Sequence, residues 1–340
     1  MRVALDAAPL SLSSGGLKRY VSELARALKE TFPEDEFALV PGAPPPGASW
    51  LDRRWWMFGL NRELARIGAC VFHGTNFEAP YIPLRPSVVT VHDLSPWLDR
   101  SWHSGAARVR SRAPAVLRLG LATMVITGSS AVRAAVIERF RLHPSRVVAV
   151  PLAPAPELHR VETRPPAPYL LYLGAVEPRK NIGTIIEAWR RIRPLVPIDL
   201  VIAGRIREDA PAIAPEPGLR VMGEVPGQDL PALYSGATAA LYPSLYEGFG
   251  LPVIEAMQCG TMVIASRDAS LCEVSRGAAV HVEARDAGAW AEAMLAAATR
   301  PDWAAQWRAR AAGRARDFSW TITARLTREV YEEAIRRYAF

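Results

Sequence analysis

Short runs of apolar residues alternate along the chain with segments in which apolar residues recur every three or four positions. The runs do not alternate strictly with polar residues, which is typical of parallel strands buried on both faces. The intervening segments have the period of amphipathic helices. Strands are therefore predicted at Val3–Asp6, Phe37–Val40, Cys70–Phe72, Val88–Val91, Met124–Thr127, Val147–Val150, Tyr169–Leu173, Leu200–Ala203, Leu219–Met222, Ala239–Tyr242, Met262–Ala265 and Ala279–Val282.

Because strands and helices alternate in both halves, we predict two doubly wound α/β domains, each a Rossmann-like parallel sheet with helices on both faces. Six prolines between Pro151 and Pro168 are typical of a linker. After Phe318, apolar residues at helical spacing predict a terminal helix. The predicted divisions are residues 1–155, 156–318 and 319–340.

The composition narrows the class of protein. Half of the 340 residues are hydrophobic, yet no apolar run approaches the roughly 18 residues that span a bilayer. The N-terminal residues lack the apolar region and cleavage site of a secretory signal. Cys70, Cys259 and Cys272 lack the spacing of a zinc site or a disulfide framework. We expect a soluble, cytoplasmic protein.

The positive charge is concentrated in the first half of the chain. Residues 1–150 contain 19 Lys and Arg against 12 Asp and Glu, whereas residues 151–340 contain 22 of each. Two interpretations stay open. One is a basic, aromatic surface that touches anionic lipid headgroups on the inner face of the membrane or a lipid pyrophosphate, and the other is a solvated face in a chain that favours arginine over lysine. No nucleic-acid partner is expected. The residues concerned are Arg108, Arg110, Arg112, Arg118, Arg133, Arg139, Arg141, Arg146, Trp55, Trp56, Trp97 and Trp102.

The segment Pro243–Glu255 carries the most specific chemistry. An apolar run ends in a turn with Glu247, and Gly248, Phe249 and Gly250 then precede Leu251 and a helical pattern with proline in its first turn. Strand, glycine loop and helix are predicted in this order. Glycines permit close approach of a ligand, and the first amides of a helix suit a phosphate.

Two carboxylates belong to this segment. Glu247 is predicted on the loop and Glu255 about one turn into the helix, so that they would flank the anion site. Carboxylates accept hydrogen bonds from hydroxyls, and a sugar on one side with a ribose on the other would complete a nucleotide sugar. By spacing alone, an ordinary strand-to-helix turn with exposed glutamates is a serious alternative, and the flanking glycines argue against it.

A second segment, Gly174–Asn181, follows a predicted strand and opens the helix predicted at 182–193. Arg179 and Lys180 would add two cations beside the helix N-terminus. Lysine occurs at only three positions of this arginine-rich chain, so its presence at 180 suggests a need for a compact ammonium. The alternative is a surface basic pair.

Two further sites precede these segments in the chain. Gly15 and Gly16 lie between the first strand and a helix, but without a Gly-x-Gly-x-x-Gly fingerprint, so NAD binding is not expected. His92 follows a predicted strand, and ligands bind at the carboxyl ends of strands in open α/β sheets. A structural histidine is the alternative there, and His73 is assigned a structural role.

The motifs around Glu247–Glu255 and Glu177–Asn181 resemble those of the retaining GT-B glycosyltransferases, in particular glycosyltransferase family 4 with its bacterial O-antigen and polysaccharide mannosyltransferases. The resemblance implies two Rossmann-like domains facing each other across a cleft. Residues 1–155 would bind the acceptor and residues 156–318 the nucleotide-sugar donor. The helix at 319–340 would pack back on the N-terminal domain.

The same resemblance implies roles for individual residues. His92, Glu247 and Lys180 would be catalytic. Relatives recognise the nucleotide base around Gly223–Pro226. In one respect the chain differs, because many relatives have Arg where Ala175 stands. The donor-binding residues implied are Gly15, Gly16, Arg179, Lys180, Glu247, Gly248, Phe249, Gly250, Leu251 and Glu255.

We therefore expect a retaining hexosyltransferase that needs no metal or cofactor, since no Asp-x-Asp follows a strand and no His-x-x-x-His occurs. The donor expected is GDP-mannose, and the acceptor a glycan or a polyprenyl-linked glycan. Two alternatives stay open. One is a nucleotide-sugar 2-epimerase with the same architecture, and the other is a non-catalytic protein that binds a sugar nucleotide or a lipid.

Overall fold

The computed structural model describes residues 1–340 apart from 13–14, 103–104, 211 and 340. The chain forms two compact units. One comprises Met1–Leu152 together with Ser319–Phe340, and the other Ala153–Phe318. The first change of unit thus precedes the predicted boundary at 155/156 by a few residues, and the return falls between Phe318 and Ser319.

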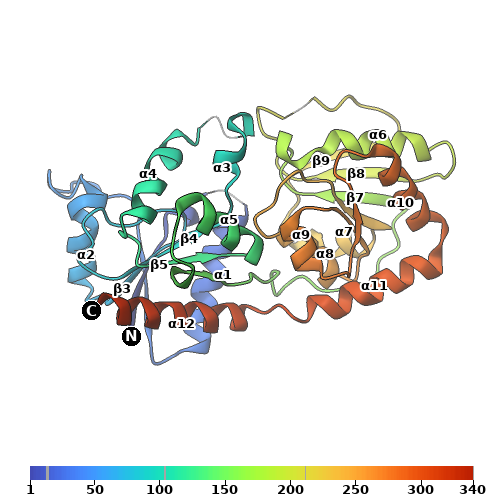
Figure 1. Ribbon diagram of the computed structural model, residues 1–340. Helices are drawn as coiled ribbons and strands as arrows, with labels where there is room; N and C mark the ends of the chain where they lie inside the picture. Colours follow the sequence, from blue (N-terminus) through green and yellow to red (C-terminus); the bar gives the residue numbers. More distant parts are fainter. Residues whose placement is uncertain (13–14, 103–104, 211, 340) are drawn as a thin grey trace. The chain divides into compact units, whose positions relative to one another are not determined.

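The first unit is built on a parallel sheet in the order β2-β1-β3-β4-β5-β6 (Figure 1). All five strand pairs run parallel, because a helix or a long connection intervenes between successive strands. The strands are β1 (Arg2–Asp6), β2 (Glu36–Val40), β3 (Val71–Gly74), β4 (Ser87–Val91), β5 (Met124–Thr127) and β6 (Val147–Ala149).

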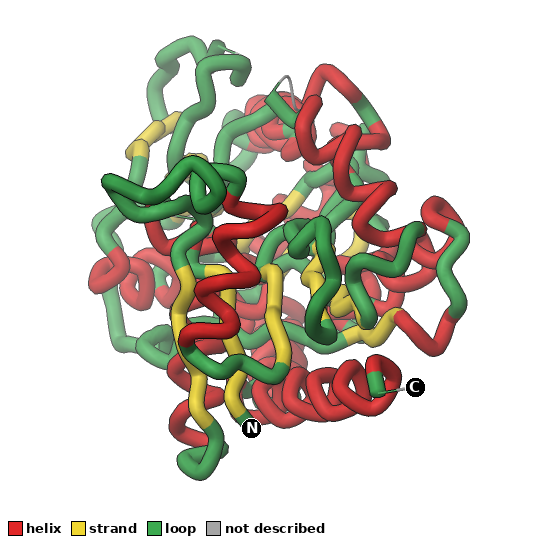
Figure 2. Tube along the Cα trace, turned by 90° about the vertical axis from the view of Figure 1, so that its left-hand side faces the viewer, coloured by secondary structure: helices red, strands yellow, loops and turns green. Residues whose placement is uncertain are grey.

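The helices of the first unit include one from the far end of the chain. Helix α12 (Trp320–Tyr338) packs against α1 and against strands β3 to β5. Asp35 accepts from Arg328 of α12 at 2.7 Å and pairs with the Met1 ammonium, and Figures 1 and 2 both place the N-terminus beside α12. The other helices are α1 (Gly16–Thr31), α2 (Leu60–Arg66), α3 (Ser95–Leu98), α4 (Ala107–Arg118) and α5 (Ser130–Phe140).

The second unit repeats this architecture with the strand order β12-β11-β10-β7-β8-β9, again parallel. Its strands are β7 (Tyr169–Leu173), β8 (Asp199–Ala203), β9 (Leu219–Gly223), β10 (Ala239–Tyr242), β11 (Val263–Ser266) and β12 (Val280–Val282). Its helices are α6 (Ile182–Ile192), α7 (Leu230–Ser235), α8 (Leu251–Gln258), α9 (Ala269–Ser275), α10 (Ala287–Thr299) and α11 (Pro301–Ala315).

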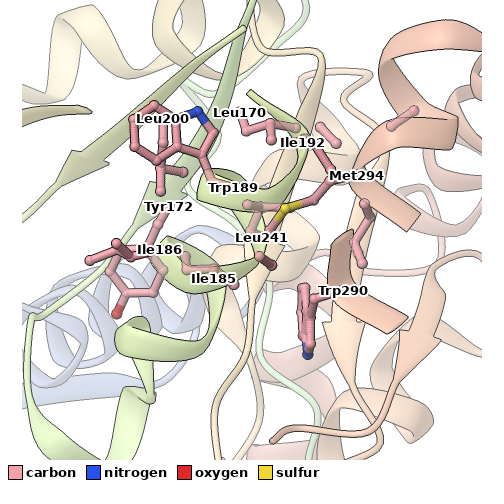
Figure 3. Close-up of a cluster of buried hydrophobic side chains, with 14 of the residues drawn as sticks. Leu170, Tyr172, Ile185, Ile186, Trp189, Ile192, Leu200, Leu241, Trp290 and Met294 are labelled. Atoms are coloured by element: carbon pink, nitrogen blue, oxygen red, sulfur yellow. The ribbon is translucent and has the colours of Figure 1, made fainter. Parts of the chain in front are cut away.

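A dense core holds one face of this second sheet against α6 and α10 (Figure 3). Trp189 and Trp290 are fully buried in it, together with alternate residues of the strands such as Leu200. The buried indole of Trp189 donates to the carbonyl oxygen of Ile198 at 2.8 Å, so its polar atom is satisfied. This packing fixes the starting points of the loops at the carboxyl edge of the sheet.

The predicted fold class is confirmed. Each of the twelve predicted strands is present with shifts of at most about two residues at its ends. Short elements were not predicted, among them the π-helix at Trp55–Gly59. In the part of the chain that is described, no helix has both the length and the apolarity needed to cross a bilayer.

Candidate functional site

The loop after β7 brings two cations to the carboxyl edge of the second sheet. Pro178–Lys180 forms a 3-10 turn, and Asn181 then adopts a left-handed conformation before α6 begins. The Asn181 side chain donates to the carbonyl oxygens of Pro243 and Ala284, at 3.1 and 2.6 Å. A motif residue without a predicted role thus ties three loops together.

The loop after β10 lies against this turn. The amide of Leu245 donates to the carbonyl oxygen of Arg179 at 2.9 Å. The amide of Glu247 donates to Asp268 at 3.2 Å, and the hydroxyl of Ser244 donates to the Glu247 carboxylate at 2.6 Å. Glu247 is held by its backbone and its side chain together.

Glu247 lies between both predicted cations. The Lys180 ammonium donates to its Oε1 at 2.5 Å, and Arg179 donates to its Oε2 at 3.2 Å. Burial alone would raise the pKa of this carboxyl, but the two cations and the hydrogen bonds outweigh burial and lower it to about 2. Glu247 is therefore ionised at neutral pH.

The interpretations of Glu247, Arg179 and Lys180 as surface charges are wrong. Glu247 is only 8% exposed, and the side chains of Arg179 and Lys180 are 11% and 12% exposed. Charges this deeply withdrawn from water are costly unless paired. Glu247, Arg179 and Lys180 meet this condition, because each is in an ion pair.

The N-terminus of α8 completes this edge. Gly250 has φ of 99°, a conformation that strains any other residue, and a Cβ atom there would lie 2.5 Å from Cδ2 of Leu271, which would have to move. Leu251 begins the helix with Pro252 in its first turn, as predicted. Phe249 is buried against Phe318, with ring centroids 6.0 Å apart.

Glu255 lies within α8 and is 3% exposed. Its carboxylate accepts a hydrogen bond from the buried hydroxyl of Tyr234 at 3.1 Å. The alternative of an exposed glutamate is therefore wrong for this residue as well. The hydrogen bond from Tyr234 fixes the orientation of the Glu255 carboxylate, and a carboxylate with a fixed orientation is suited to binding a hydroxyl.

His92 follows β4 in the first unit and is partly buried. Its Nε2–H donates to the carbonyl oxygen of Thr75 at 2.8 Å, and the Tyr20 ring packs edge-on at 4.8 Å. Burial lowers the pKa of His92, so the ring is neutral at pH 7.

His73 has the structural environment that was predicted for it. It is fully buried, and its two nitrogens contact the hydroxyls of Tyr331 and Thr90 at 2.7 and 2.8 Å. Burial lowers its pKa to about 3.

The predicted site residues fall into two groups. Arg179, Lys180 and Glu247 are in contact in the second unit, and Gly248–Leu251 and Glu255 belong to the same loop and helix. Gly15, Gly16 and His92 belong to the first unit. Gly15 has φ of 112° at the start of α1, and residues 13 and 14 lie outside the described part.

Besides Asn181 and Tyr234, four residues that support the site were given no role from the sequence. Ser244 and Asp268 bond Glu247, whereas Glu177 and Arg207 extend the network around Arg179. Asp268 precedes a short helical pattern and could have been found as an N-cap. Arg207 carries no local signal, because its partner lies 30 residues away.

A hollow of about 440 Å³ lies along β9 and the loop after it. Its lining includes Tyr169, Met222 and the segment Glu224–Pro226. This is the segment at which the resemblance implies recognition of a nucleotide base.

Within the described ranges, no group of three or more His, Cys, Asp and Glu side chains is arranged to hold a metal ion. The arrangement supplies an ammonium, a guanidinium and helical amides beside two buried carboxylates. Such groups can bind an anion and hydroxyls together.

The family described as "Glycosyl transferases group 1" matches residues 156–314. The O-antigen chain mannosyltransferase B of Escherichia coli is 33% identical over 276 residues, which cover 74% of this chain and 71% of that protein. The O-antigen chain mannosyltransferase RfbU of Salmonella typhimurium is 27% identical over 267 residues, 74% of this chain and 71% of that protein.

Solved structures show the same fold. A sucrose-phosphate synthase from Thermosynechococcus elongatus superimposes with a TM-score of 0.77 at 20% identity, covering 98% of both chains. At that identity the likeness shows the fold alone, that of the GT-B enzymes. Together with the sequence matches, it shows that the chain belongs to the group 1 glycosyltransferases and is a glycosyltransferase.

Proposed function

We propose that this protein transfers a hexosyl group, with mannosyl from GDP-mannose as the first choice, to a hydroxyl of a glycan or lipid-linked glycan with retention of anomeric configuration. The observation that carries the proposal is the buried contact of Glu247 with Lys180 and Arg179 beside the start of α8. The choice of mannose rests on the two O-antigen mannosyltransferase relatives.

In the proposed reaction, the bond between the anomeric carbon and the diphosphate oxygen breaks. A bond from the acceptor oxygen forms on the same face of the sugar, and the acceptor's proton leaves with the nucleoside diphosphate. Lys180, Arg179 and the first amides of α8 stabilise the negative charge that develops on the departing diphosphate. Protein cations take the part that Mg²⁺ plays elsewhere, so no metal or cofactor is required.

The carboxylates would hold the donor's hydroxyls. Glu247 accepts from the sugar, and Glu255 accepts from the ribose. Neutral His92 would accept a hydrogen bond from a sugar hydroxyl at Nδ1, since its single N–H is on Nε2 and donates to Thr75. Gly15 and Gly16 would permit close approach of the diphosphate. The base would lie beside the Glu224–Pro226 segment, which lines the hollow along β9.

The nucleotide is identified first by a thermal-shift screen with GDP, UDP, ADP and dTDP, because a ligand that binds only the folded state raises its melting temperature. GDP is expected to give the largest rise. The matching sugar nucleotide is then incubated with acceptor glycans, and proton NMR of the product reports the anomeric configuration.

Three outcomes would contradict the proposal. An inverted anomeric centre would exclude retention. Activity that is lost in EDTA and restored by manganese would exclude metal independence. An altered free sugar nucleotide formed without any acceptor would identify an epimerase.

We also propose that the first unit touches anionic lipid at the inner face of the membrane. Two of the residues expected to carry this contact are engaged inside the unit instead. Trp55 is buried, and Arg146 donates to the carbonyl oxygens of Thr123, Leu117 and Ala122. The segment before the π-helix is more suitable: Trp50 is 69% exposed with the Arg54 guanidinium over its ring at 5.1 Å.

The lipid contact is tested by sedimentation with vesicles of phosphatidylglycerol or phosphatidylcholine. Binding to the anionic vesicles alone is expected, and it should be lost in a variant with Trp50→Ser, Arg53→Glu and Arg54→Glu. The matched control reverses exposed charges of the second unit, Arg300→Glu and Arg316→Glu. Equal binding of both variants would refute this surface.

A further inference from the structure

The loop after β8 is fastened to the loop that carries Arg179. The amide of Val176 donates to the carbonyl oxygen of Arg205 at 2.9 Å, and the amide of Arg207 donates to that of Val176 at 3.1 Å. Gly204 makes this approach feasible, because a Cβ atom there would lie 2.0 Å from the carbonyl oxygen of Gly174. The backbone therefore places Arg207 beside Glu177.

Glu177 is shared by two guanidinium groups. Its Oε1 accepts from Arg179 at 2.6 Å, and its Oε2 accepts from Arg207 at 2.6 Å. The residue is 6% exposed, and the Arg207 side chain is 20% exposed. A buried carboxylate with both oxygens in charge-assisted hydrogen bonds is rigid, and loss of one partner leaves it inadequately compensated.

Arg179 passes this rigidity on to Glu247. Its guanidinium contacts Glu177 through Nη2, and through Nη1 it donates to the carbonyl oxygen of Tyr246 at 2.8 Å and to Glu247 at 3.2 Å. The orientation of Glu247 is thus set from one side by Lys180 and from the other by the series Arg207, Glu177 and Arg179.

The series ends in a fourth charged residue. Arg207 also donates to Asp209 at 2.6 Å, so Arg179, Glu177, Arg207 and Asp209 together are neutral. We therefore expect the series to act on Glu247 through its fixed geometry and not through a net charge.

We infer that Glu177 and Arg207 are positioning residues for the transfer reaction: acting through Arg179, they hold Glu247 in the orientation that the transferred sugar requires. This inference rests on the proposed function. It gives a role to two residues that need not touch either substrate.

The test compares steady-state kinetics of Arg207→Ala, Arg207→Lys and Glu177→Gln with the wild type. Displacement of a positioned group by about 1 Å can cost roughly 10²-fold in rate, so Arg207→Ala should lower kcat by about 10- to 100-fold with little change in the donor's KM. Arg207→Lys keeps the charge and should recover part of kcat. Glu177→Gln should resemble Arg207→Ala.

Arg190→Ala is the matched control, because Arg190 forms an exposed pair with Glu216 elsewhere in the same unit. It should leave kcat and KM unchanged. Melting temperature and the affinity for the nucleoside diphosphate are measured on every variant. If the role were purely structural, the substitutions would lower the melting temperature. They would not lower kcat at an unchanged KM, and Arg207→Lys would not recover kcat.

Two failures can be told apart. A wild-type protein that transfers no sugar from any nucleotide sugar would refute the proposed function, and with it this inference. A wild type that is active while folded Arg207→Ala keeps its kcat would overturn the positioning role alone. If Arg207→Ala does not fold, wild-type kcat in Glu177→Gln overturns the role in the same way.

Discussion

At the scale of residues, the position of the buried Glu247 carboxylate depends on its contacts with two cationic side chains. Glu247 accepts hydrogen bonds from the Lys180 ammonium and from one guanidinium nitrogen of Arg179. In the proposed function, a diphosphate would bind the remaining donors of this ammonium and guanidinium while Glu247 keeps its contacts and its orientation toward the sugar. Donor binding and orientation of Glu247 are coupled in this way.

The substitution Lys180→Ala should lower kcat with the sugar-nucleotide donor by roughly 10²-fold or more, as expected when one preorganised charge at the leaving group is lost. Single-turnover assays of purified protein measure the effect. Lys29→Ala, at an exposed position of α1, is the control with an unchanged rate. A Lys180→Ala rate close to that of the wild type would contradict the assignment.

The buried imidazole of His73 makes stability depend on pH. Its pKa of about 3 lies below the unfolded value of 6.5, so its contribution is complete above pH 6.5 and is lost as the pH falls. Between pH 7 and pH 5 this amounts to about 2 kcal/mol of unfolding free energy. His73→Asn should lack this part of the pH dependence in urea denaturation.

The wild type and His73→Asn have to be compared, because Asp6 and Asp268 change the unfolding free energy with pH in the opposite direction to His73. Burial raises their pKa values to about 6, so they favour the folded state as the pH falls below 6. The difference between wild type and variant cancels their contribution. An identical pH dependence of both proteins would refute the effect of His73.

At the scale of elements, local sequence patterns predicted the strands and the glycine loop, because these depend on the residues of the segment itself. Buried parallel strands are continuous apolar runs, so each strand was found, and the loop before α8 was predicted because glycine and proline restrict the backbone locally. The links from Glu177 to Arg207 and from Glu255 to Tyr234 were not predicted. Such contacts depend on which strands, loops and helices become neighbours in the fold, and no local sequence pattern specifies these neighbours.

The start of α8 should be intolerant of any side chain at Gly250. Gly250→Ala combines a positive φ with a contact at 2.5 Å, and it should reduce stability by about 1–3 kcal/mol and weaken nucleoside diphosphate binding. Gly313→Ala in α11 meets nothing within 4 Å and should be neutral or slightly stabilising. Thermal unfolding and calorimetric titration measure both, and equal behaviour of the two variants would contradict the steric argument.

At the scale of the whole molecule, the chain changes unit twice, after Leu152 and after Phe318. The last helix therefore completes a unit that began at residue 1. Its Tyr331 is fully buried and contacts His73, and its Thr323 hydroxyl donates to the carbonyl oxygen of Pro151 at 2.8 Å. We therefore expect the first unit to need α12 for its stability.

A chain that ends at Phe318 should lose the hydrogen-exchange protection of β3 to β5, because α12 packs against these strands. Strands β7 to β12 should keep theirs, since their unit is complete without α12. A chain that ends at Tyr338 serves as the control with full protection. Retained protection of β3 to β5 in the shorter chain would refute the dependence on α12.

The buried pairing of Lys180 has a practical consequence in a chain with only three lysines. Acetylation by an amine-specific reagent requires an accessible amine, so exposed Lys29 should react quickly and Lys180, which is 12% exposed and bonded to Glu247, slowly. Glu247→Gln should speed acetylation at Lys180, and mass spectrometry of the peptides would record it. Covalent labelling of one amine would thereby measure occupancy of the site in unfractionated cell extracts, without a substrate or an acceptor in hand.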